Sequence, residues 1–334
     1  MVHHHRILER TTRRCFLGAV AGIAVSPVAT ALAQVESKSE THQQRLALGA
    51  GRPRSRVVGI KQPGLWGQGI VHPGLLREAL GTVLARACDV ASAADAWHQI
   101  LAAQDVVGIK FNRSGQRELG TTREVGAAII ESLVQAGWSG SRIVLIEAPE
   151  GLAKRYSVES AREGYRSQPT DFGSGSDNLA GVLDQVTAIV NVPFLKTHNL
   201  CAMTCCLKNL SHAMIKHPAR FHADGCSPFI ADIVALPEIK DKLRLNIVDA
   251  IRVVHEGGPL VDQDHVSHVG AILASTDPVA ADAVGFQLLN AERERVGLPL
   301  LASTPQSVNY LAAAHRRELG TVLMHGIELQ WISR

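Results

Sequence analysis

Short runs of β-branched residues alternate with helical stretches along most of this chain, and this pattern limits the fold more than any other feature. Strands are predicted at 56–60, 105–110, 142–146, 186–192, 243–248 and 270–274, with an edge strand at 327–331. Helices are predicted at 75–87, 94–102, 122–136, 199–215, 228–236, 279–290 and 305–316, with an irregular excursion at 150–178. Such alternation is typical of a mostly parallel sheet with helices on both faces. We therefore predict a single large α/β domain with an irregular insertion.

The composition excludes several classes of protein. Hydrophobic residues make up 46% of the 334 positions and charged residues 19%, which excludes a disordered or collagen-like chain. Six cysteines are too few for a disulfide-dense mini-scaffold. The sequence contains no dinucleotide fingerprint, no P-loop and no G-x-S-x-G elbow, so neither NAD nor ATP is predicted as a cofactor.

Residues 1–33 have the pattern of an export signal that is removed from the folded protein. Basic residues come first, an apolar stretch of about 14 residues follows, and a run of small residues ends at Ala33. The apolar stretch is shorter than the ~20 residues that span a bilayer. The pair Arg13-Arg14 resembles a twin-arginine signal. We therefore predict export to the periplasm by the twin-arginine machinery with cleavage near Ala33, and the alternative is an uncleaved anchor helix.

Cleavage at this position would change the charge of the protein that remains. Residues 1–33 hold four of the 34 basic and one of the 31 acidic residues, so 30 of each remain and the formal net charge falls from +3 to zero. Because no basic stripe is visible elsewhere, nucleic acid is not a predicted partner. The mature chain would have a polar linker at 34–55, an α/β domain at 56–334 and no transmembrane segment.

Ionisable side chains follow the predicted strands at the points where the strands end. Binding sites of parallel sheets lie at the carboxyl ends of the strands. The residues at or just beyond these ends are Lys110, Asn112, Glu147, Lys196, His198, Asp249, Glu256, Gly257, Gly258, Asp277 and Asp282. Each has an ordinary structural explanation by itself, as Asp277 before Pro278 is a good helix cap. Ionisable groups from five successive strands together predict a functional site.

Residues 198–226 hold four of the five cysteines that follow the signal. In the helix predicted for this segment, four side chains would share one face because they lie at i, i+4, i+7 and i+11: Cys201, Cys205, Lys208 and His212. Thiolates and imidazoles in this arrangement suit zinc or another transition metal. The alternatives are cysteines that pack as small core residues and a disulfide. No ferredoxin-type cysteine run is present.

Seven segments carry a resemblance to a known family: 109–112, Glu147, 193–198, 207–210, 247–250, 256–259 and 275–282. In this order they resemble the bacterial and archaeal proteins of domain-of-unknown-function family 362, which are often described as iron–sulfur centre proteins. The resemblance covers about residues 56–290 and implies the fold and the location of the site more than a reaction. Many members place their cluster cysteines in an attached ferredoxin-like segment, which this sequence lacks. Cys201 and Cys205 are not part of the family pattern.

We expect an exported enzyme that acts on a small anionic substrate. Lys110, Lys196 and Lys208 would supply positive charge for a carboxylate or phosphate. His198 would be the general acid or base, and Glu147, Asp249 and Asp282 would orient these groups or hold a metal.

The residues expected to contact the substrate are Asn112, Asn209, Glu256, Gly257, Gly258, Asp277 and Asp282. Two further functions remain open at this point. The first is a periplasmic redox protein without substrate chemistry of its own, in which Cys201, Cys205 and His212 hold a transition metal or part of an iron–sulfur cluster. The second is a solute-binding protein that turns nothing over.

Overall fold

The computed structural model describes residues 54–113, 121–259, 262–301 and 308–333, so the predicted signal and nearly all of the predicted linker lie outside them. The strands are β1 (Ser55–Lys61), β2 (Trp66–Gly67), β3 (Ile70–Val71), β4 (Val107–Phe111), β5 (Ile143–Ile146), β6 (Glu159–Ser160), β7 (Thr170–Asp171), β8 (Ser176–Asp177), β9 (Ala188–Val192), β10 (Phe194–His198), β11 (Ala202–Thr204), β12 (Leu243–Val254), β13 (Val266–Ser275) and β14 (Ile327–Ser333). The α-helices are α3 (Pro73–Ala87), α4 (Ala93–Ile100), α5 (Arg123–Gln135), α6 (Leu152–Tyr156), α7 (Cys206–Ser211), α8 (Phe229–Val234), α9 (Pro237–Lys240), α10 (Pro278–Arg295) and α11 (Asn309–Arg316). Short 3-10 turns include η3 (His212–Met214), η4 (Pro218–Phe221), η5 (Ala223–Cys226) and η6 (Gln263–His265).

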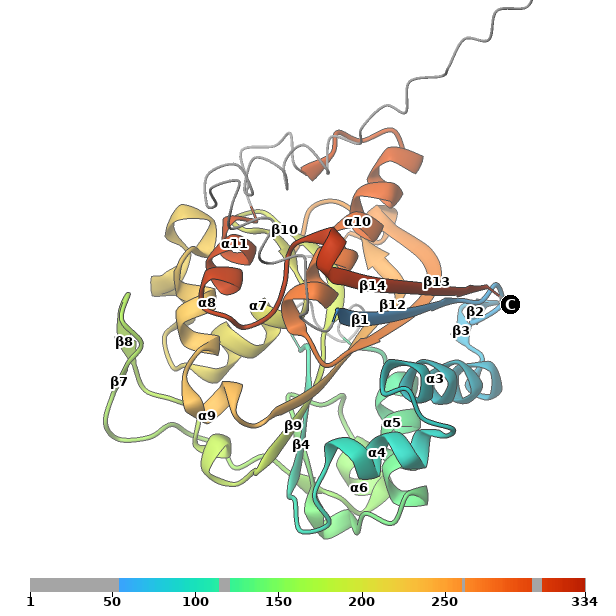
Figure 1. Cartoon of the computed structure of the whole chain (residues 1–334), viewed down its shortest axis with the longest axis horizontal. Helices are drawn as coiled ribbons and strands as arrows, with labels where there is room; N and C mark the ends of the chain where they lie inside the picture. The colour runs from blue at the N-terminus through green and yellow to red at the C-terminus, as the bar shows by residue number, and fades with distance from the viewer. Residues whose placement is uncertain (1–53, 114–120, 260–261, 302–307, 334) are drawn as a thin grey trace, which may run out of the picture.

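A central sheet with the strand order β14-β1-β13-β12-β9-β4-β5-β6 runs through the molecule (Figure 1). The strands from β12 to β6 are parallel to one another, and β14 is parallel to β1. Only β13, within this order, is antiparallel to its neighbours β12 and β1. The predicted fold class, a mostly parallel sheet in an α/β domain, is confirmed.

Helices cover both faces of the sheet because consecutive strand residues point to opposite sides. Val57 of β1 belongs to the core formed with α7, α8, α10 and α11, and Val58 belongs to the core formed with α3, α4 and α5. Figure 1 shows these two sets of helices on opposite sides of the strands. No helix among the described residues is long and apolar enough to cross a membrane.

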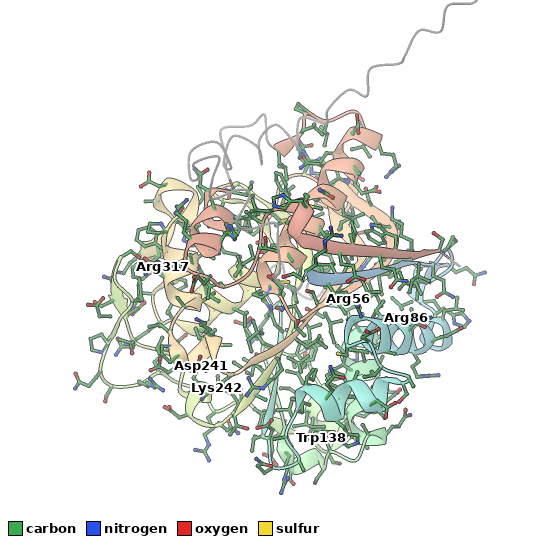
Figure 2. The ribbon with its side chains drawn as sticks, in the orientation of Figure 1. Arg56, Arg86, Trp138, Asp241, Lys242 and Arg317 are labelled. Atoms are coloured by element: carbon green, nitrogen blue, oxygen red, sulfur yellow. The ribbon has the colours of Figure 1, made fainter. Side chains whose placement is uncertain are left out.

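Arg56 connects strand β1 with helix α3 through a hydrogen bond. Its guanidinium donates a hydrogen bond of 3.4 Å to the carbonyl oxygen of Arg86, near the C-terminal end of α3 (Figure 2). A cation at this end of a helix is favourable because the unsatisfied carbonyls carry partial negative charge. This contact supports the packing of α3 against the sheet.

A proline divides one strand into two that pair with different parts of β12. β9 pairs with the first residues of β12, whereas β10 pairs with its later residues, with Phe194 opposite Asp249 and Lys196 opposite Val254. Pro193 lies between β9 and β10 and has no N–H to donate to a ladder, so a strand is readily interrupted there. The interruption carries Lys196 and His198 along the carboxyl-terminal half of β12.

The helix predicted at 199–215 is wrong. After β10 the chain turns back as β11, which is antiparallel to β10 with His198 opposite Ala202. The helix α7 begins only at Cys206 and ends at Ser211. Pairing with β10 thus prevails over helical spacing in the first half of the segment, and the four side chains predicted on one helical face are distributed over a hairpin and a short helix.

The prediction that five strand ends meet at one edge is also wrong for β13. Parallel neighbours need a crossover connection, whereas a short connection makes the next strand antiparallel. The described part of the connection from β12 holds a short loop and η6, and β13 returns in the opposite direction, with Ser275 opposite Asn246. Its carboxyl end therefore lies at the other edge of the sheet.

Candidate functional site

A buried lysine on β4 forms an ion pair with a carboxylate that follows β5. Lys110 is fully buried, and its Nζ lies 2.8 Å from Oε2 of Glu147. Glu147 has a φ of 54°, a left-handed conformation that is strained for a residue with a side chain. Burial lowers the pKa of Lys110, and the carboxylate of Glu147 opposes this change. The Glu147 side chain is 35% exposed, so the pair connects the interior with the surface.

A chain of asparagines connects this lysine to three other elements. Asn209 of α7 accepts hydrogen bonds of 3.1 Å at Oδ1 from Lys110 and from Asn112. Its Nδ2 donates to Asn191 of β9 at 2.8 Å, and Asn191 donates to Asn246 of β12 at 2.8 Å. Buried amides need partners for both oxygen and nitrogen. This chain satisfies them and holds α7 against β4, β9 and β12.

Lys196 of β10 joins the same group. It is fully buried, and its Nζ donates to Oδ1 of Asn112 at 3.2 Å. Burial lowers the pKa of Lys196 to about 8; Glu147 opposes this change and Lys110 adds to it. Lys196 therefore exchanges its proton much closer to neutral pH than an ordinary lysine does. We call Lys110, Asn112, Lys196 and Asn209 the lysine–asparagine cluster.

His198, two residues further along β10, is held in one neutral form. The backbone N–H of Leu200 donates to its Nδ1 at 3.1 Å, which assigns the ring proton to Nε2. Burial lowers the pKa of His198 to about 3, and the charge of Lys208 lowers it further. Because the lone pair on Nδ1 accepts the hydrogen bond from Leu200, the neutral ring can only donate, through the N–H at Nε2. This geometry favours ligand binding over proton abstraction at His198.

A second group of side chains surrounds Lys208 of α7. Its Nζ lies 2.9 Å from Nε2 of His222 and 3.5 Å from Sγ of Cys226. A hydrogen bond with Cys201 lowers the pKa of Cys226 to about 7 against the effect of burial, and the charge of Lys208 acts in the same direction as the hydrogen bond. The ring of His222 stacks on that of His198 with centroids 5.6 Å apart. This stacking connects the two groups.

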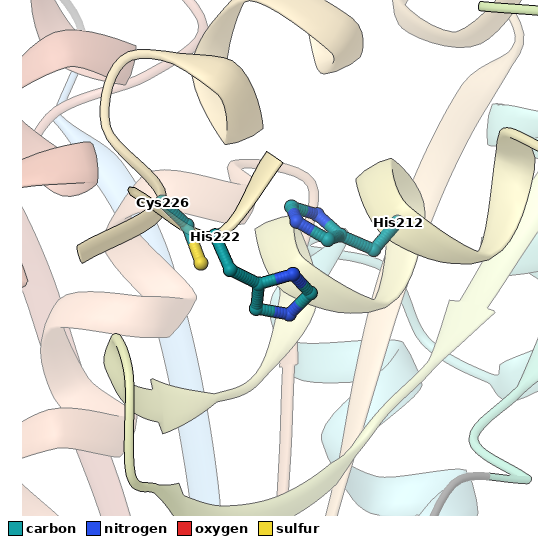
Figure 3. A group of neighbouring side chains, drawn as sticks. All are labelled: His212, His222 and Cys226. Carbon is teal, nitrogen blue, oxygen red and sulfur yellow. The ribbon is translucent and has the colours of Figure 1, made fainter. Parts of the chain in front are cut away.

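The predicted metal ligand His212 belongs to this second group. Figure 3 shows His212, His222 and Cys226 directed toward one another from the region between α7 and α8. One potential ligand atom of each lies within 4.8 Å of the others, and we call these three residues the histidine–cysteine cluster. Cys201, also a predicted ligand, contacts the cluster through its hydrogen bond with Cys226.

The third predicted ligand, Cys205, lies in a different group with Cys206 and Asp282. Burial raises the pKa of Cys205 to about 11 and also raises that of Cys206, so both thiols keep their protons. Asp282 of α10 accepts hydrogen bonds from the backbone N–H groups of Cys206 at 2.6 Å and Leu207 at 3.2 Å. This carboxyl group therefore caps the start of α7, and core packing accounts for the two thiols beside it.

Asp249 supports the start of another helix. Its Oδ2 accepts a hydrogen bond of 2.8 Å from the backbone N–H of Thr122, which precedes α5, and its Oδ1 accepts one of 3.2 Å from Ile251. Asp249 is fully buried, and burial raises its pKa. With both oxygens bonded to the backbone, this side chain positions the beginning of α5 beside the lysine–asparagine cluster.

The predicted glycine loop after β12 lies against β10. Gly258 donates its N–H to Oγ1 of Thr197 at 3.1 Å, and its carbonyl accepts from the N–H of Asn199 at 2.8 Å. Gly257 has a φ of 75°, which favours glycine. Glu256 is directed toward a histidine of η6, 3.6 Å away. The loop thus fixes the backbone on both sides of His198.

Asp277 is not brought to either cluster. It lies beyond the end of β13, where its Oδ1 accepts hydrogen bonds of 2.8 Å from the N–H groups of Val279 and Ala280. Its Oδ2 accepts from Ser55 at 2.6 Å and from the N–H of Thr321 at 2.9 Å. These contacts are those of a helix cap for α10, the structural explanation given for this residue above.

Sequence reasoning missed four residues of the two groups: Asn191, Asn246, His222 and Cys226. Asn191 interrupts an apolar strand, and a polar residue in a fully buried strand signals a hydrogen-bonded partner. His222 and Cys226 lie in the segment already marked by its cysteines and histidines. Their placement depends on the turns η4 and η5, which spacing along one helix does not describe.

Comparison with known proteins supports the family resemblance. Residues 153–287 match the model of the family described as domain of unknown function, DUF362. The matched region contains β9, β10, α7 and β12, and with them Lys196, Asn209 and the whole histidine–cysteine cluster, whereas Lys110, Asn112 and Glu147 precede it. No curated protein matches the chain.

Proposed function

We propose that this chain is an exported enzyme that binds a small anion, a carboxylate or a phosphate, at the lysine–asparagine cluster. One observation carries the proposal: two buried lysines from different strands meet at a hydrogen-bonded pair of amides, Asn112 and Asn209. The charge of a third lysine, Lys208, also acts on His198, as that of Lys196 does.

Burial of amino groups is costly, and this cost supports a role in binding negative charge. A buried ammonium group loses several kcal/mol of hydration, and nearby positive charges add repulsion. A bound anion would offset both effects. An ammonium group offers only donors, and neutral His198 adds another, so the groups match a ligand rich in acceptor oxygens.

The proposed roles follow from the contacts of each side chain. Lys110, held by Glu147, and Lys208 would attract the anion, and His198 would donate a hydrogen bond to it. Lys196 would transfer a proton because its pKa lies near 8. Asp249 and Asp282 would act as positioning residues that hold the helices α5 and α7.

Replacement of Lys196 by methionine is expected to weaken anion binding at least tenfold. The change keeps the aliphatic volume but removes the amino group. Calorimetric titration with inorganic phosphate and with malonate measures the effect, and Lys216→Met, at an exposed lysine, is the matched control that should bind like the wild type. Affinity of the wild type should also fall as the pH rises through about 8, where Lys196 loses its proton. Equal affinity of the Lys196 variant and the wild type, or no binding of either anion, would contradict the proposal.

Export is a second part of the proposed function. Protein recovered from the periplasm is expected to begin near residue 34, which intact-mass measurement shows directly. Replacing Arg13 and Arg14 by lysines should retain the protein in the cytoplasm, because the twin-arginine route reads that pair. A periplasmic protein with the mass of residues 1–334, or export that is unaffected by the paired lysines, would refute this part.

A metal-binding redox protein is the alternative function, and the histidine–cysteine cluster is the observation in its favour. The described cysteines do not form one set of four around a common point: Cys201 and Cys226 lie together, and Cys205 and Cys206 lie beside Asp282. The donor set of the cluster, two imidazoles and a thiol, therefore favours a single transition-metal ion over an iron–sulfur cluster.

A further inference from the structure

We infer that the histidine–cysteine cluster is a binding site for a divalent transition metal of the zinc or cobalt type, and that the amino group of Lys208 competes with the metal for His222 and Cys226. The inference deepens the alternative function proposed above, metal binding at this cluster, and it needs no anionic substrate. It rests on the contacts of Lys208, on the hydrogen bonds of the two histidines and on the spacing of the three ligand atoms.

The spacing of the cluster is close to that of a metal site. The ligand atoms of a tetrahedral zinc ion lie about 3.5 Å apart, given bonds of about 2.0 Å to nitrogen and 2.3 Å to sulfur. Here the three candidate atoms lie within 4.8 Å of one another. Small side-chain rotations of His212, His222 and Cys226 would close this difference.

The Nε2 atom of His222 already directs its lone pair toward a cation, the amino group of Lys208. Its Nδ1 lies 3.0 Å from the carbonyl oxygen of Pro218, and a carbonyl only accepts, so Nδ1 carries the ring proton. Its Nε2 is then unprotonated and faces the amino group of Lys208 at 2.9 Å. Fixing one ring nitrogen through a carbonyl is how metal-binding histidines are commonly oriented.

The Nδ1 atom of His212 could bind a metal without leaving the hydroxyl group of Ser211 without a hydrogen-bond partner. Its Nε2 donates to the carbonyl of Phe221 at 2.9 Å, and its Nδ1 accepts from the hydroxyl of Ser211 at 3.0 Å. That hydroxyl also lies 3.3 Å from the carbonyl oxygen of Lys208. If a metal took Nδ1, the hydroxyl would rotate to this second acceptor, so the hydrogen-bond cost of binding is small.

Lys208 is the obstacle to metal binding. Its Nζ contacts both His222 and Cys226, so a metal bonded to those two atoms would take the volume that the amino group fills. A divalent ion and an ammonium group would also repel each other strongly at such a short distance. Metal and the Lys208 amino group therefore exclude one another, and the side chain must move away before the site fills.

Replacing Lys208 by methionine is the decisive test. Titration of the reduced, full-length protein with Co²⁺ reports ligation through the sulfur-to-cobalt absorption band, which needs no enzyme activity. We expect Lys208→Met to bind Co²⁺ at least tenfold more tightly than the wild type, and Lys208→Arg, which keeps a cation, to show no gain. In the Lys208→Met background, Cys226→Ser should abolish the band, whereas Cys88→Ser, at a buried cysteine in the other core, should leave it unchanged.

Two outcomes would overturn the inference: no gain in affinity for Lys208→Met, or a sulfur-to-cobalt band that survives Cys226→Ser. Circular dichroism and thermal unfolding of each variant show whether it is folded. If Cys226→Ser does not fold, His222→Gln in the same background replaces it and should weaken Co²⁺ binding at least tenfold; an unchanged affinity would refute the site. Phosphate and malonate titrations of the metal-free wild type report on the anion site separately, so failure of one proposal is distinguishable from failure of the other.

Discussion

Asp282→Ala is expected to lower the free energy of unfolding by about 3 kcal/mol. The carboxyl group is fully buried and accepts hydrogen bonds from the backbone N–H groups of Cys206 and Leu207 at the start of α7. Alanine would leave both donors without this acceptor in a buried site, where each unsatisfied donor costs about 1–3 kcal/mol. Urea denaturation followed by circular dichroism measures the change.

Asp282→Asn is the matched variant because it keeps one acceptor oxygen and nearly the same shape, so a smaller loss is expected. Burial raises the pKa of Asp282 from 3.8 to about 7, which favours the protonated form in the folded state. The stability that this group contributes is thus fully present below pH 3.8 and is lost as the pH rises through about 7. The thiols beside it stay protonated in that range because burial raises their pKa values.

The difference in stability between the wild type and Asp282→Asn should therefore be larger at pH 5 than at pH 8. A difference that stays constant with pH would show that the carboxyl group does not titrate in this window. A stability of Asp282→Ala equal to that of the wild type would show that the capping contact contributes nothing.

Gly258→Ala is expected to destabilise the fold by about 3 kcal/mol and to disturb the backbone around His198. A Cβ at this position would overlap the backbone carbonyl oxygen of Thr197, which cannot rotate away as a side chain can. Relief of the overlap would break the hydrogen bonds that join Gly258 to Thr197 and Asn199. Since these contacts flank His198, affinity for phosphate or malonate should fall as well.

Gly81→Ala is the control because its effect should have the opposite sign. Gly81 lies within α3, and a Cβ there would meet nothing within 4 Å. Alanine should stabilise the helix by roughly 1 kcal/mol, since glycine is the poorer helix former. Thermal unfolding of the two variants gives the comparison, and a Gly258→Ala protein as stable as the wild type would mean that the loop lies elsewhere.

Much of the fold is predictable because its helices and strands have strong local patterns. The apolar residues of α3 recur at helical spacing, and β4 is a continuous buried run of strand length. Each of these local patterns indicates one type of secondary structure without reference to the rest of the fold. The segment that forms β11 and α7 has no such single solution, because its residues are compatible with both a helix and a strand. Pairing with the preceding strand β10 and capping by Asp282 decide between them, and Asp282 is distant in sequence from the segment that it caps.

The candidate site is predictable in part for a related reason. Strand-end residues such as Lys110 and Lys196 can be located once the strands are known, because parallel strands share a carboxyl edge. Asp277 shows the limit of this reasoning. Its strand is antiparallel, and strand direction depends on the length and course of the connection from β12 rather than on the residues of β13.

The amino-acid sequence by itself determines the fold class, the buried strands and the set of lysines, amides, thiols and imidazoles available at their ends. It does so because hydrophobic periodicity and polar interruptions act over a few residues. Only the tertiary structure decides which of these groups meet. The proline break before β10 and the turns between α7 and α8 place Lys208 between His222 and Cys226 and place Lys196 against Asn112. These contacts join residues many positions apart, so they depend on strand direction and packing that no local pattern encodes.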